Sequence, residues 1–507
     1  MTFNSQVIIQ DIRAGFEKML EYVTGEQART ATADATERGL FKMLIEMGLK
    51  LLTLFFVIRS QNASRESFKT ADGSELRYHR DTERRYISIF GKLCFARPYF
   101  YRKGNKAGQI PLDAALSLGD DCYSDLVREV SDYLGVYGVY HKGCETLERL
   151  LGLRLSTRVV QSNLGEDAAD VLAYYAQKPA PVASSEAEIL VIQADGKGVP
   201  LILEETKADE VRLGKGEKHG HKKEAIVTTV YSIEAFTRTP EQVVASYYDK
   251  NSFDRPSKPQ NKHLWATLDG KDTALNRLAE QVRLRLGSHI QHKIALCDGC
   301  EALQTRIAKY FPDFTQILDF IHANEYLWDV ANALFGETND QRFAWMRSHT
   351  LQLLSGHTKQ LIAEFRLLAT QPKISKRKRI QLIKTTNYFE RNLPFMDYPT
   401  YLSNGWPIAS GVIEGACRHF VKDRCELSGM RWLQCGAENL LRLRAVAENN
   451  DWDNYHAYRK QQRHQRLYAS LPTNLEPVEA QSLIPATAVE LLVPNKSSAY
   501  LQMPLAA

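Results

Sequence analysis

The sequence predicts a multidomain α+β protein, in which a mostly helical N-terminal part precedes an α/β sheet that is interrupted by further helices. Its 507 residues exceed one compact core, since domains usually hold about 100–200 residues. Helical spacing of apolar residues dominates residues 1–75 and 116–176. Runs of β-branched residues beyond residue 188 first follow one another and then alternate with helical stretches, which is typical of a sheet of mixed strand direction.

Composition excludes fibrous, disordered and membrane-spanning classes. The chain is 44% hydrophobic and 25% charged, as in ordinary globular proteins. Its net charge of +5 is small, so a nucleic-acid partner must be recognised by local basic patches. Eight scattered cysteines and no recognisable leader lead us to expect a cytoplasmic protein with reduced thiols. The most apolar segment, residues 51–58, is far shorter than the ~20 residues of a membrane span, so no membrane partner is expected.

The first two segments are a helical module at residues 1–75 and a small β-hairpin region at residues 76–115. Apolar residues of the first segment recur at helical spacing, as in Leu44, Met47 and Leu51. In the second segment, aromatic and β-branched runs at residues 86–90 and 92–96 flank Gly91, which we interpret as the turn of a hairpin.

Residues 116–176 contain the outline of a helix-turn-helix. A helical stripe ends at a break over residues 152–156, and Ser156 is placed to cap a second helix that turns Val160 and Leu164 inward. An ordinary helical hairpin fits this pattern equally well. If the second helix reads DNA, the residues at its start that face outward toward bases and phosphates are Thr157, Arg158 and Gln161.

A linker rich in Pro, Ala and Ser is predicted at residues 177–188, and we place the main domain boundary there. Strand patterns at residues 189–193, 199–204 and 225–233 suggest an antiparallel meander. Another buried strand is predicted at residues 293–297, after a helix at 272–286. These elements place the first part of the α/β core at residues 189–322.

The remaining chain is predicted to be helical and then irregular. Residues 323–404 are mostly helical in pattern, and residues 405–455 contain a strongly patterned helix after Pro407. Residues 456–507 are assigned as a C-terminal tail, whose last part contains several prolines and no clear period.

Three carboxylates occupy positions that core packing explains poorly. Asp195 and Asp298 each follow a buried strand and precede a glycine. Glu414 lies beside the apolar stripe of a helix that is formed by Ile413, Cys417, Phe420 and Val421. The alternatives are two turn-forming Asp-Gly steps and a solvated pair between Glu414 and Arg418. Three carboxylates at one sheet edge would meet the ligand preference of Mg²⁺.

Two basic segments flank the predicted core. Residues 212–223 carry five Lys or Arg against one Glu, and residues 373–379 carry five basic residues and no acid. Solvated loops are one explanation, and contact with DNA phosphates is the other. The residues expected to make such contacts are Lys215, Lys218, Lys222, Lys223, Lys376, Arg377, Lys378 and Arg379.

Six short motifs in one order resemble the transposases of the bacterial ISKra insertion-sequence group, relatives of the Mutator-like DDE transposases. The resemblance covers roughly residues 110–455. The motifs are Ala194-Asp-Gly-Lys-Gly198, Arg212-Leu-Gly-Lys-Gly-Glu217, Leu296-Cys-Asp-Gly299, Asp319-Phe-Ile-His322, Ser410-Gly-Val-Ile-Glu-Gly415 and Ser428-Gly-Met-Arg-Trp432.

This resemblance implies a ribonuclease H-like α/β catalytic core that residues 323–404 interrupt as a helical insertion. It implies that Asp195, Asp298 and Glu414 are both the catalytic residues and the metal ligands, with Asp319 and His322 as auxiliary residues. The expected cofactor is Mg²⁺ or Mn²⁺, with two ions in each site. Some relatives carry a zinc ribbon in the region of residues 90–110, but only Cys94 remains here, so no zinc is expected.

The resemblance also implies a DNA transposase that cleaves and joins strands at insertion-sequence ends. Its expected partner is double-stranded DNA, as terminal inverted repeats and target, and the protein is expected to form a homo-oligomer on DNA in the nucleoid-containing cytoplasm. Arg431 could hold a phosphate and Trp432 could stack on an unpaired base, although a core tryptophan is the alternative. The competing functions are an inactive or domesticated DNA-binding protein and a ribonuclease H-like nuclease such as a junction resolvase.

Overall fold

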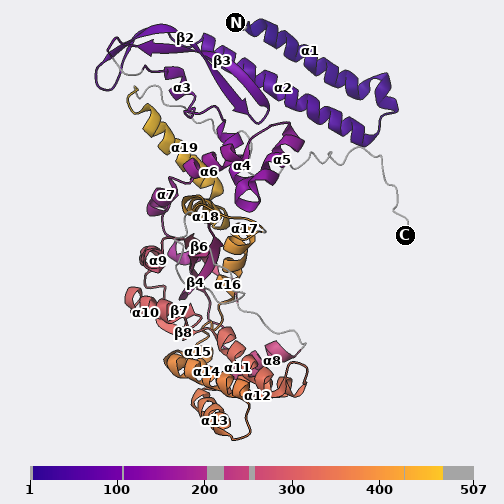
Figure 1. The fold of residues 1–507 in the computed structure, drawn as a ribbon. Helices are drawn as coiled ribbons and strands as arrows, with labels where there is room; N and C mark the ends of the chain where they lie inside the picture. Colours follow the sequence, from indigo (N-terminus) through magenta and orange to yellow (C-terminus); the bar gives the residue numbers. More distant parts are fainter. Residues whose placement is uncertain (1–3, 105–107, 203–221, 250–256, 428, 472–507) are drawn as a thin grey trace. The chain divides into compact units, whose positions relative to one another are not determined.

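The computed structural model describes residues 4–104, 108–202, 222–249, 257–427 and 429–471. Helices and two sheets are both present, which confirms the mixed α+β class (Figure 1). The chain divides into two compact units. The first comprises Met1–Tyr86, Leu93–Cys122 and Arg463–Ala507, and the second comprises Ile87–Lys92 and Tyr123–Gln462.

The first unit begins with two long helices that lie side by side (Figure 1). The side chains of Asn4 and Thr32 cap α1 (Ser5–Thr24) and α2 (Ala33–Gln61) by accepting backbone N–H groups of their first turns. A short 3₁₀ turn, η1 (Glu26–Arg29), lies between the two helices. A three-stranded sheet and a short helix follow: β1 (Phe68–Lys69), β2 (Glu75–Ser88), β3 (Gly91–Tyr101) and α3 (Pro111–Ala115).

The C-terminal half of α2 packs on the hairpin of β2 and β3. Phe56 stacks on Phe95 with ring centroids 4.4 Å apart, and Tyr86 meets the same Phe56 ring edge-on. The predicted hairpin is therefore present, but its two-residue connection is formed by Ile89 and Phe90, and Gly91 is already the first residue of β3.

The second unit opens with four helices: α4 (Asp125–Tyr137), α5 (Tyr140–Leu151), α6 (Thr157–Asp167) and α7 (Val171–Gln177). Gly152 ends α5 in the left-handed conformation, where a side chain would be strained. The Ser156 side chain caps α6 by accepting the N–H of Val159 at 3.3 Å, as predicted. Helix, turn and helix thus occur where the sequence indicates them.

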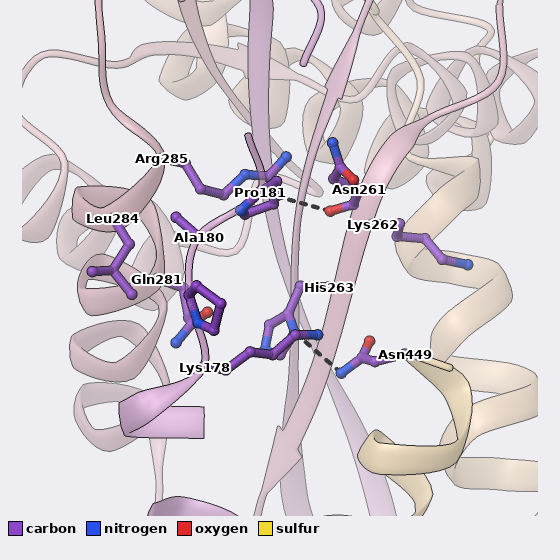
Figure 2. A pocket seen from close by; sticks show the side chains of 11 residues that line it. Lys178, Ala180, Pro181, Asn261, Lys262, His263, Gln281, Leu284, Arg285 and Asn449 are labelled. Atoms are coloured by element: carbon purple, nitrogen blue, oxygen red, sulfur yellow. Dashed lines mark hydrogen bonds between the residues drawn. The ribbon is translucent and has the colours of Figure 1, made fainter. Parts of the chain in front are cut away.

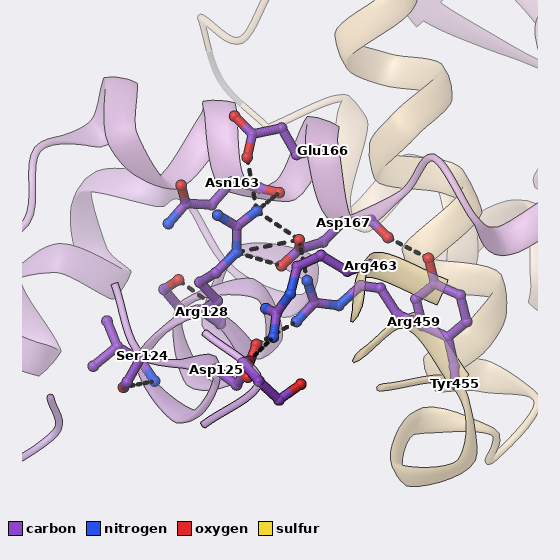
Figure 3. Close-up of polar contacts among 12 residues, drawn as sticks. Ser124, Asp125, Arg128, Asn163, Glu166, Asp167, Tyr455, Arg459 and Arg463 are labelled. Carbon is purple, nitrogen blue, oxygen red and sulfur yellow. Dashed lines mark hydrogen bonds and ion pairs between the residues drawn. The ribbon is translucent and has the colours of Figure 1, made fainter. Parts of the chain in front are cut away.

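A buried charge network joins two of these helices to α19 (Trp452–Tyr468). Asp167 of α6 accepts hydrogen bonds from Arg128 of α4 and from Arg459 of α19, both at 2.6 Å (Figure 3). All three side chains are almost fully buried. Removal of one partner would leave an uncompensated charge inside the protein, which typically costs about 3–5 kcal/mol.

The main boundary predicted at residues 177–188 lies inside this second unit. The segment holds only a short 3₁₀ turn, η2 (Ala183–Ser185), but the residues before it pack against the C-terminal helices. Tyr175 donates to Asp451 at 3.1 Å, and Lys178 pairs with the same carboxylate at 2.6 Å. A composition that disfavours helix therefore marks a connection here, and it does not separate two compact units.

The central sheet has five strands in the order β6-β5-β4-β7-β8. Its central strand, β4, pairs antiparallel with β5 and parallel with β7, so strand direction is mixed as predicted. The strands β5 and β6 are antiparallel, and β7 and β8 are parallel. The strand bounds are β4 (Ile189–Pro200), β5 (Lys222–Ile233), β6 (Gln260–Thr267), β7 (His292–Cys297) and β8 (Thr315–Leu318).

The antiparallel meander is formed by β4, β5 and β6, which are not the three strands that were predicted. Residues 199–204 were expected to form a separate strand, but Val199 and Pro200 are the end of β4, and residues 203–204 lie outside the described part. The glycines at positions 196 and 198 suggested a turn, which is why two strands were predicted where the structure has one. Both glycines pair with β5 in regular register, Gly196 with Ile226 and Gly198 with Glu224, so they continue the strand and do not form a turn. The third strand of the meander is instead β6.

Helices cover both faces of the sheet. Leu190, Ile192 and Ala194 point to the face covered by α9 (Lys271–Arg285) and α10 (Glu301–Tyr310). The opposite face of β4 to β6 packs on α16 (Gly411–Ala416), η4 (Cys417–Lys422, a π-helix), α17 (Asp423–Cys425) and α18 (Gln434–Glu448). Because side chains alternate along a strand, Asp195 lies on this second face of the sheet.

The region predicted to be helical between residues 323 and 404 is helical. It shares an apolar core with the sheet through residues such as Leu327, Phe365 and Phe389. Its elements are α11 (Phe320–Phe335), α12 (Gln341–Leu354), α13 (Thr358–Thr370), α14 (Lys376–Asn392), η3 (Leu393–Phe395) and α15 (Tyr398–Ser403), and α8 (Pro240–Tyr248) contacts α12.

The chain remains helical beyond residue 455, where the predicted tail begins, because α19 continues to Tyr468 and buries Tyr455, His456 and Arg459. The proline-containing end of the tail, residues 472–507, lies outside the described residues. Within the described ranges, no helix combines the length and the apolar character that are needed to cross a bilayer.

Candidate active site at the sheet edge

Three neighbouring strands carry aspartates toward the same edge of the sheet. Gln193 of β4 pairs with Leu296 of β7, and Asp195 and Asp298 each lie two residues farther along these parallel strands. Cys297 of β7 pairs with Leu318 of β8, and Asp319 follows directly. Equal offsets in parallel strands bring residues to one edge, so the register itself gathers the three carboxylates.

Local hydrogen bonds fix each carboxylate. Asp298 accepts the N–H of Cys300 at 2.9 Å, and Asp319 accepts the N–H of Ile321 at 2.8 Å, so both orient the start of the following helix. Asp195 accepts its neighbour's N–H at 2.6 Å, and its other oxygen accepts the Cys417 thiol at 3.3 Å. The turn-forming role that was the alternative explanation for Asp298 is therefore present, and it leaves one carboxylate oxygen with no hydrogen bond to the described part of the protein.

Glu414 approaches this edge from the helical segment that begins at Gly411. Its apolar stripe is buried as predicted, and Glu414 itself is 44% exposed in its side chain. The backbone N–H of Ile413 donates to the side chain of Gln193 at 2.9 Å, which joins this helix to β4. The segment then adopts π-helical geometry from Cys417, a distortion that is frequent at functional sites.

Asp319, His322 and Glu414 form a group that could hold a metal ion. One ligand atom from each lies within 4.8 Å of the others, and within the described ranges this is the one such group found. His322 Nε2 lies 3.9 Å from Glu414 Oε1. The Ser410 hydroxyl contacts a carboxylate oxygen of Asp319 and lies 3.3 Å from Glu414 Oε1.

The group of possible ligands in the structure therefore differs from the expected set of Asp195, Asp298 and Glu414. Glu414 lies beside the two residues expected to be auxiliary, Asp319 and His322. Asp195 and Asp298 share the sheet edge but are not members of that group. The two sets are nevertheless electrostatically connected, because the Asp298 carboxylate and the His322 imidazole both influence the pKa of Asp195.

The pKa values reflect a buried accumulation of negative charge. The pKa of Asp319 is raised to about 6, chiefly by burial; the hydrogen bond from Ser410 opposes this rise, and the nearby Glu414 makes a smaller raising contribution. Burial also raises the pKa of Asp195, and Asp298 adds repulsion. Burial opposes protonation of His322, yet the surrounding carboxylates together raise its pKa above the ordinary value. Bound cations would relieve this repulsion, and carboxylate oxygens are the ligands that Mg²⁺ prefers.

Three positioning residues were not identified from the sequence: Gln193, Ser410 and Cys417. Gln193 could have been noticed in the sequence, because it is a polar residue at the end of an apolar run. The structure buries it fully. Ser410 precedes Glu414 by four residues, and its hydroxyl turns to Asp319, so it makes no capping bond. Cys417 was identified only as a stripe residue. Burial raises the pKa of its thiol, which therefore keeps the proton that it donates to Asp195.

The expected DNA-binding residues have different surroundings. Thr157, Arg158 and Gln161 are exposed at the start of α6, as predicted. Lys222 pairs with Glu426, and Lys223 donates to Gln434 at 2.8 Å, so both connect β5 to the segment after the π-helix. Lys215 and Lys218 lie outside the described residues.

The second basic segment lies at the start of α14. Lys376, Arg377 and Arg379 are exposed, whereas Lys378 donates to the carbonyl of Leu334 at 2.9 Å. The first three residues of α14 and the end of α11 line an open cavity with a volume of about 1020 Å³. Basic side chains at a helix N-terminus are unfavourable for the helix itself, so helix stability does not explain them.

Trp432 is a core residue in this structure. It is 6% exposed, its indole N–H donates to the carbonyl of Cys425 at 3.0 Å, and its backbone bonds to the end of β4. This burial favours the core alternative over stacking on a base. Arg431 beside it is exposed and is therefore accessible to a phosphate.

A second concave site lies beside β6, at the opposite edge of the sheet from β8. It has a volume of about 270 Å³, and its lining includes Lys178, His263, Arg285 and Asn449 (Figure 2). Burial, with a smaller contribution from nearby cations, lowers the pKa of His263 well below its ordinary value. None of the lining residues is a carboxylate, so this site is unsuited to hold Mg²⁺.

Comparison with known proteins identifies no relative, since no protein-family model and no curated protein matches the chain. The functional interpretation therefore depends on the geometry of the site.

Proposed function

We propose that this protein is a DNA transposase of the DDE kind, which cleaves and joins strands by metal-dependent phosphoryl transfer. The observation that carries the proposal is the register of β4 and β7. It sets Asp195 and Asp298 at equal offsets on adjacent parallel strands, beside the helical segment that bears Glu414. Structural carboxylates rarely gather in this way, because their repulsion is costly without a cation.

The arrangement of the sheet supports a ribonuclease H-like core. The order β6-β5-β4-β7-β8 combines antiparallel pairs with parallel pairs and has helices on both faces, in agreement with the α/β core that the resemblance implies. The helices α11 to α15 lie between β8 and the helical segment that carries Glu414, which is where the resemblance to ISKra transposases implies a helical insertion.

Within this core, Asp195, Asp298 and Glu414 are proposed to hold the metal ions, with Asp319 and His322 completing the acidic edge. Mg²⁺ held by these carboxylates would supply activation of the attacking hydroxyl and stabilisation of the leaving oxygen. Ser410 bridges Asp319 and Glu414, and Gln193 fixes the helix start relative to β4. These contacts orient Asp319 and Glu414 and join the helix of Glu414 to the strand of Asp195.

DNA is proposed to contact two exposed surfaces. Arg158 and Gln161 lie at the start of α6, in the position of a recognition helix after the Gly152 turn. Lys376, Arg377 and Arg379 at the start of α14, together with Arg431, supply phosphate contacts. Trp432 is left out of this set because it is buried.

The test uses the purified full chain with a plasmid and a duplex that carries the ends of its own element. In Mg²⁺ or Mn²⁺ we expect the duplex end to be joined covalently to the plasmid, and chelation to abolish joining. Nicked products without joining would identify a ribonuclease H-like nuclease instead. End-specific binding without any cleavage would identify an inactive DNA-binding derivative.

A further inference from the structure

The pair of helices α1 and α2 carries an apolar face that nothing in the described part of its own unit covers. On α1 the exposed residues Phe16, Leu20 and Val23 are spaced by four and three residues. On α2 the exposed residues Phe41, Leu44, Leu51, Phe55 and Ile58 fall on a repeat of three and four residues that also includes Gly48. We call these eight side chains the α1/α2 apolar face.

The two stripes lie on one side of the helix pair. The helices run antiparallel, since Asp11 pairs with Lys50 at 2.8 Å and Tyr22 donates to Ala35 at 3.0 Å. At about 100° per residue, each stripe is turned by roughly 90° from the line of contact between the helices. Because the helices are antiparallel, these turns bring both stripes to the same side.

The face is distinct from the other apolar surfaces of α2. The C-terminal half of α2 packs on the hairpin through Phe56, and its side toward α1 holds Met47, which lies against Gly15. A helix that is apolar on so much of its circumference is normally buried. No residue of α1 is buried, so the pair lacks the core that would stabilise it alone.

We propose that the α1/α2 apolar face is a self-association interface, at which two copies of this chain pair their helices into a four-helix bundle. Alternation of three and four residues is the spacing of a seam that receives another helix. The exposed area of the eight side chains is of the order of 600 Å², close to the roughly 800 Å² that each partner contributes to an ordinary stable dimer. The same surface on two copies satisfies twofold pairing.

The border of the face argues against a lipid surface as the occupant. Arg13 and Glu17 border it on α1, so the rim carries both signs of charge. Helices that lie on anionic membranes carry a predominantly basic rim. The pairing proposed here does not depend on the reaction at the acidic edge, and it supplies a way to hold two DNA ends together.

The experiment measures the mass of the full chain by sedimentation equilibrium, without DNA or metal, between about 1 and 50 µM. The parent is expected to reach twice 57.6 kDa. Leu44→Glu with Leu51→Glu places charges inside the seam and should leave a folded monomer. Lys42→Glu adds the same charge on the exposed polar side of α2 and should keep the parent's dissociation constant.

Leu51→Ala keeps high helix propensity and is the milder variant if the charged pair fails to fold. It should weaken association by about tenfold or more. A parent that stays monomeric at the highest concentration would overturn the proposal, as would a folded Leu44→Glu, Leu51→Glu variant that still dimerises like the parent. A parent monomer whose residues 41–58 are protected from hydrogen exchange at every concentration would mean that the face packs within its own chain. Failure here leaves the proposed strand transfer untouched, because neither DNA nor metal is present.

Discussion

The side-chain oxygen of Gln193 accepts the backbone N–H of Ile413 at 2.9 Å, and this bond connects the strand of Asp195 to the helix of Glu414. The N–H of Ile413 lies in the first turn of its helix and is shared between two acceptors, since it also donates to the carbonyl of Ser410 at 2.9 Å. Gln193 also donates to the Tyr231 hydroxyl at 3.2 Å, which orients its amide. This buried amide therefore helps to set the spacing of two proposed metal ligands.

Replacement of this amide should uncouple the two ligands. Gln193→Leu removes the bond between β4 and the Ile413 N–H, which keeps its second acceptor, the Ser410 carbonyl. The free energy of unfolding should fall by about 0.5–1.5 kcal/mol, and cleavage should slow. Tyr231→Phe is the matched control, because it removes the second bond of Gln193 and keeps the bond to Ile413. Thermal unfolding and strand cleavage are measured for both. Equal loss of cleavage in the two variants would show that the bond to Ile413 is unimportant.

The pKa of Asp319 predicts a pH dependence of stability in metal-free buffer. Its folded-state pKa of about 6 lies above the ordinary value near 3.8, so the folded protein binds this proton more tightly than the unfolded chain. The contribution of Asp319 to the free energy of unfolding should therefore decrease as the pH rises from about 4 to 6, by up to roughly 3 kcal/mol. Asp319→Asn should remove that decrease. The free energy of unfolding is measured against pH for the parent and the variant. The same slope in both would refute the raised pKa of Asp319.

Substitutions of Trp432 and Arg431 should have different effects: the first should lower stability, and the second should weaken DNA binding. Trp432→Ala empties a core site and should lower the free energy of unfolding by about 3–5 kcal/mol. Arg431→Ala changes an exposed side chain and should alter stability by less than about 0.5 kcal/mol while weakening DNA binding. Denaturant unfolding and DNA titration are compared for both variants. If Trp432→Ala unfolds like the parent but cleaves slowly, the base-stacking alternative is the correct one.

The basic start of α14 should contribute to the salt dependence of DNA binding. Substitution of Lys376, Arg377 and Arg379 by Gln should weaken binding to all sequences and reduce the slope of log affinity against log salt, by about 0.9 for each phosphate that the protein no longer neutralises. Lys378→Gln is the control, because Lys378 bonds to the Leu334 carbonyl and its substitution should affect thermal stability more than the slope. An unchanged slope in the triple variant would exclude this surface as a DNA-binding site.

Much of the element order was predictable because local patterns determine it. The strand before Asp298 and the cap at Ser156 depend on neighbouring residues alone, and the structure has both where they were expected. The position of Asp195 and Asp298 just after buried strand residues was likewise predicted from the sequence, whereas the register that gives them equal offsets was not.

Features that depend on distant partners were not predictable. The glycines after Asp195 suggested a turn, but the strand continues to Pro200 because these residues pair with β5. Burial of Trp432 requires its pairing with the end of β4, which no sequence pattern near residue 432 indicates. The contact of Glu414 with Asp319 and His322 arises from the path of α11 to α15 between them. Sequence patterns therefore located the acidic residues and left their grouping undetermined.

The central claim is that Asp195, Asp298 and Glu414 act together as ligands for catalytic metal. Asp298→Asn removes one negative charge and keeps the size of the side chain, so repulsion at the sheet edge decreases and the metal-free fold should be as stable as the parent or slightly more so. The control is Asp313→Asn, an exposed carboxylate near the same strands, which should cleave like the parent.

The most direct measurement is Mg²⁺-dependent cleavage and strand transfer of an element-end duplex by Asp298→Asn beside the parent, with DNA binding measured in the same samples. We predict that both reactions are abolished while end binding is kept, because the proposed DNA contacts lie on other elements. Cleavage by Asp298→Asn at a rate near that of the parent would contradict the assignment.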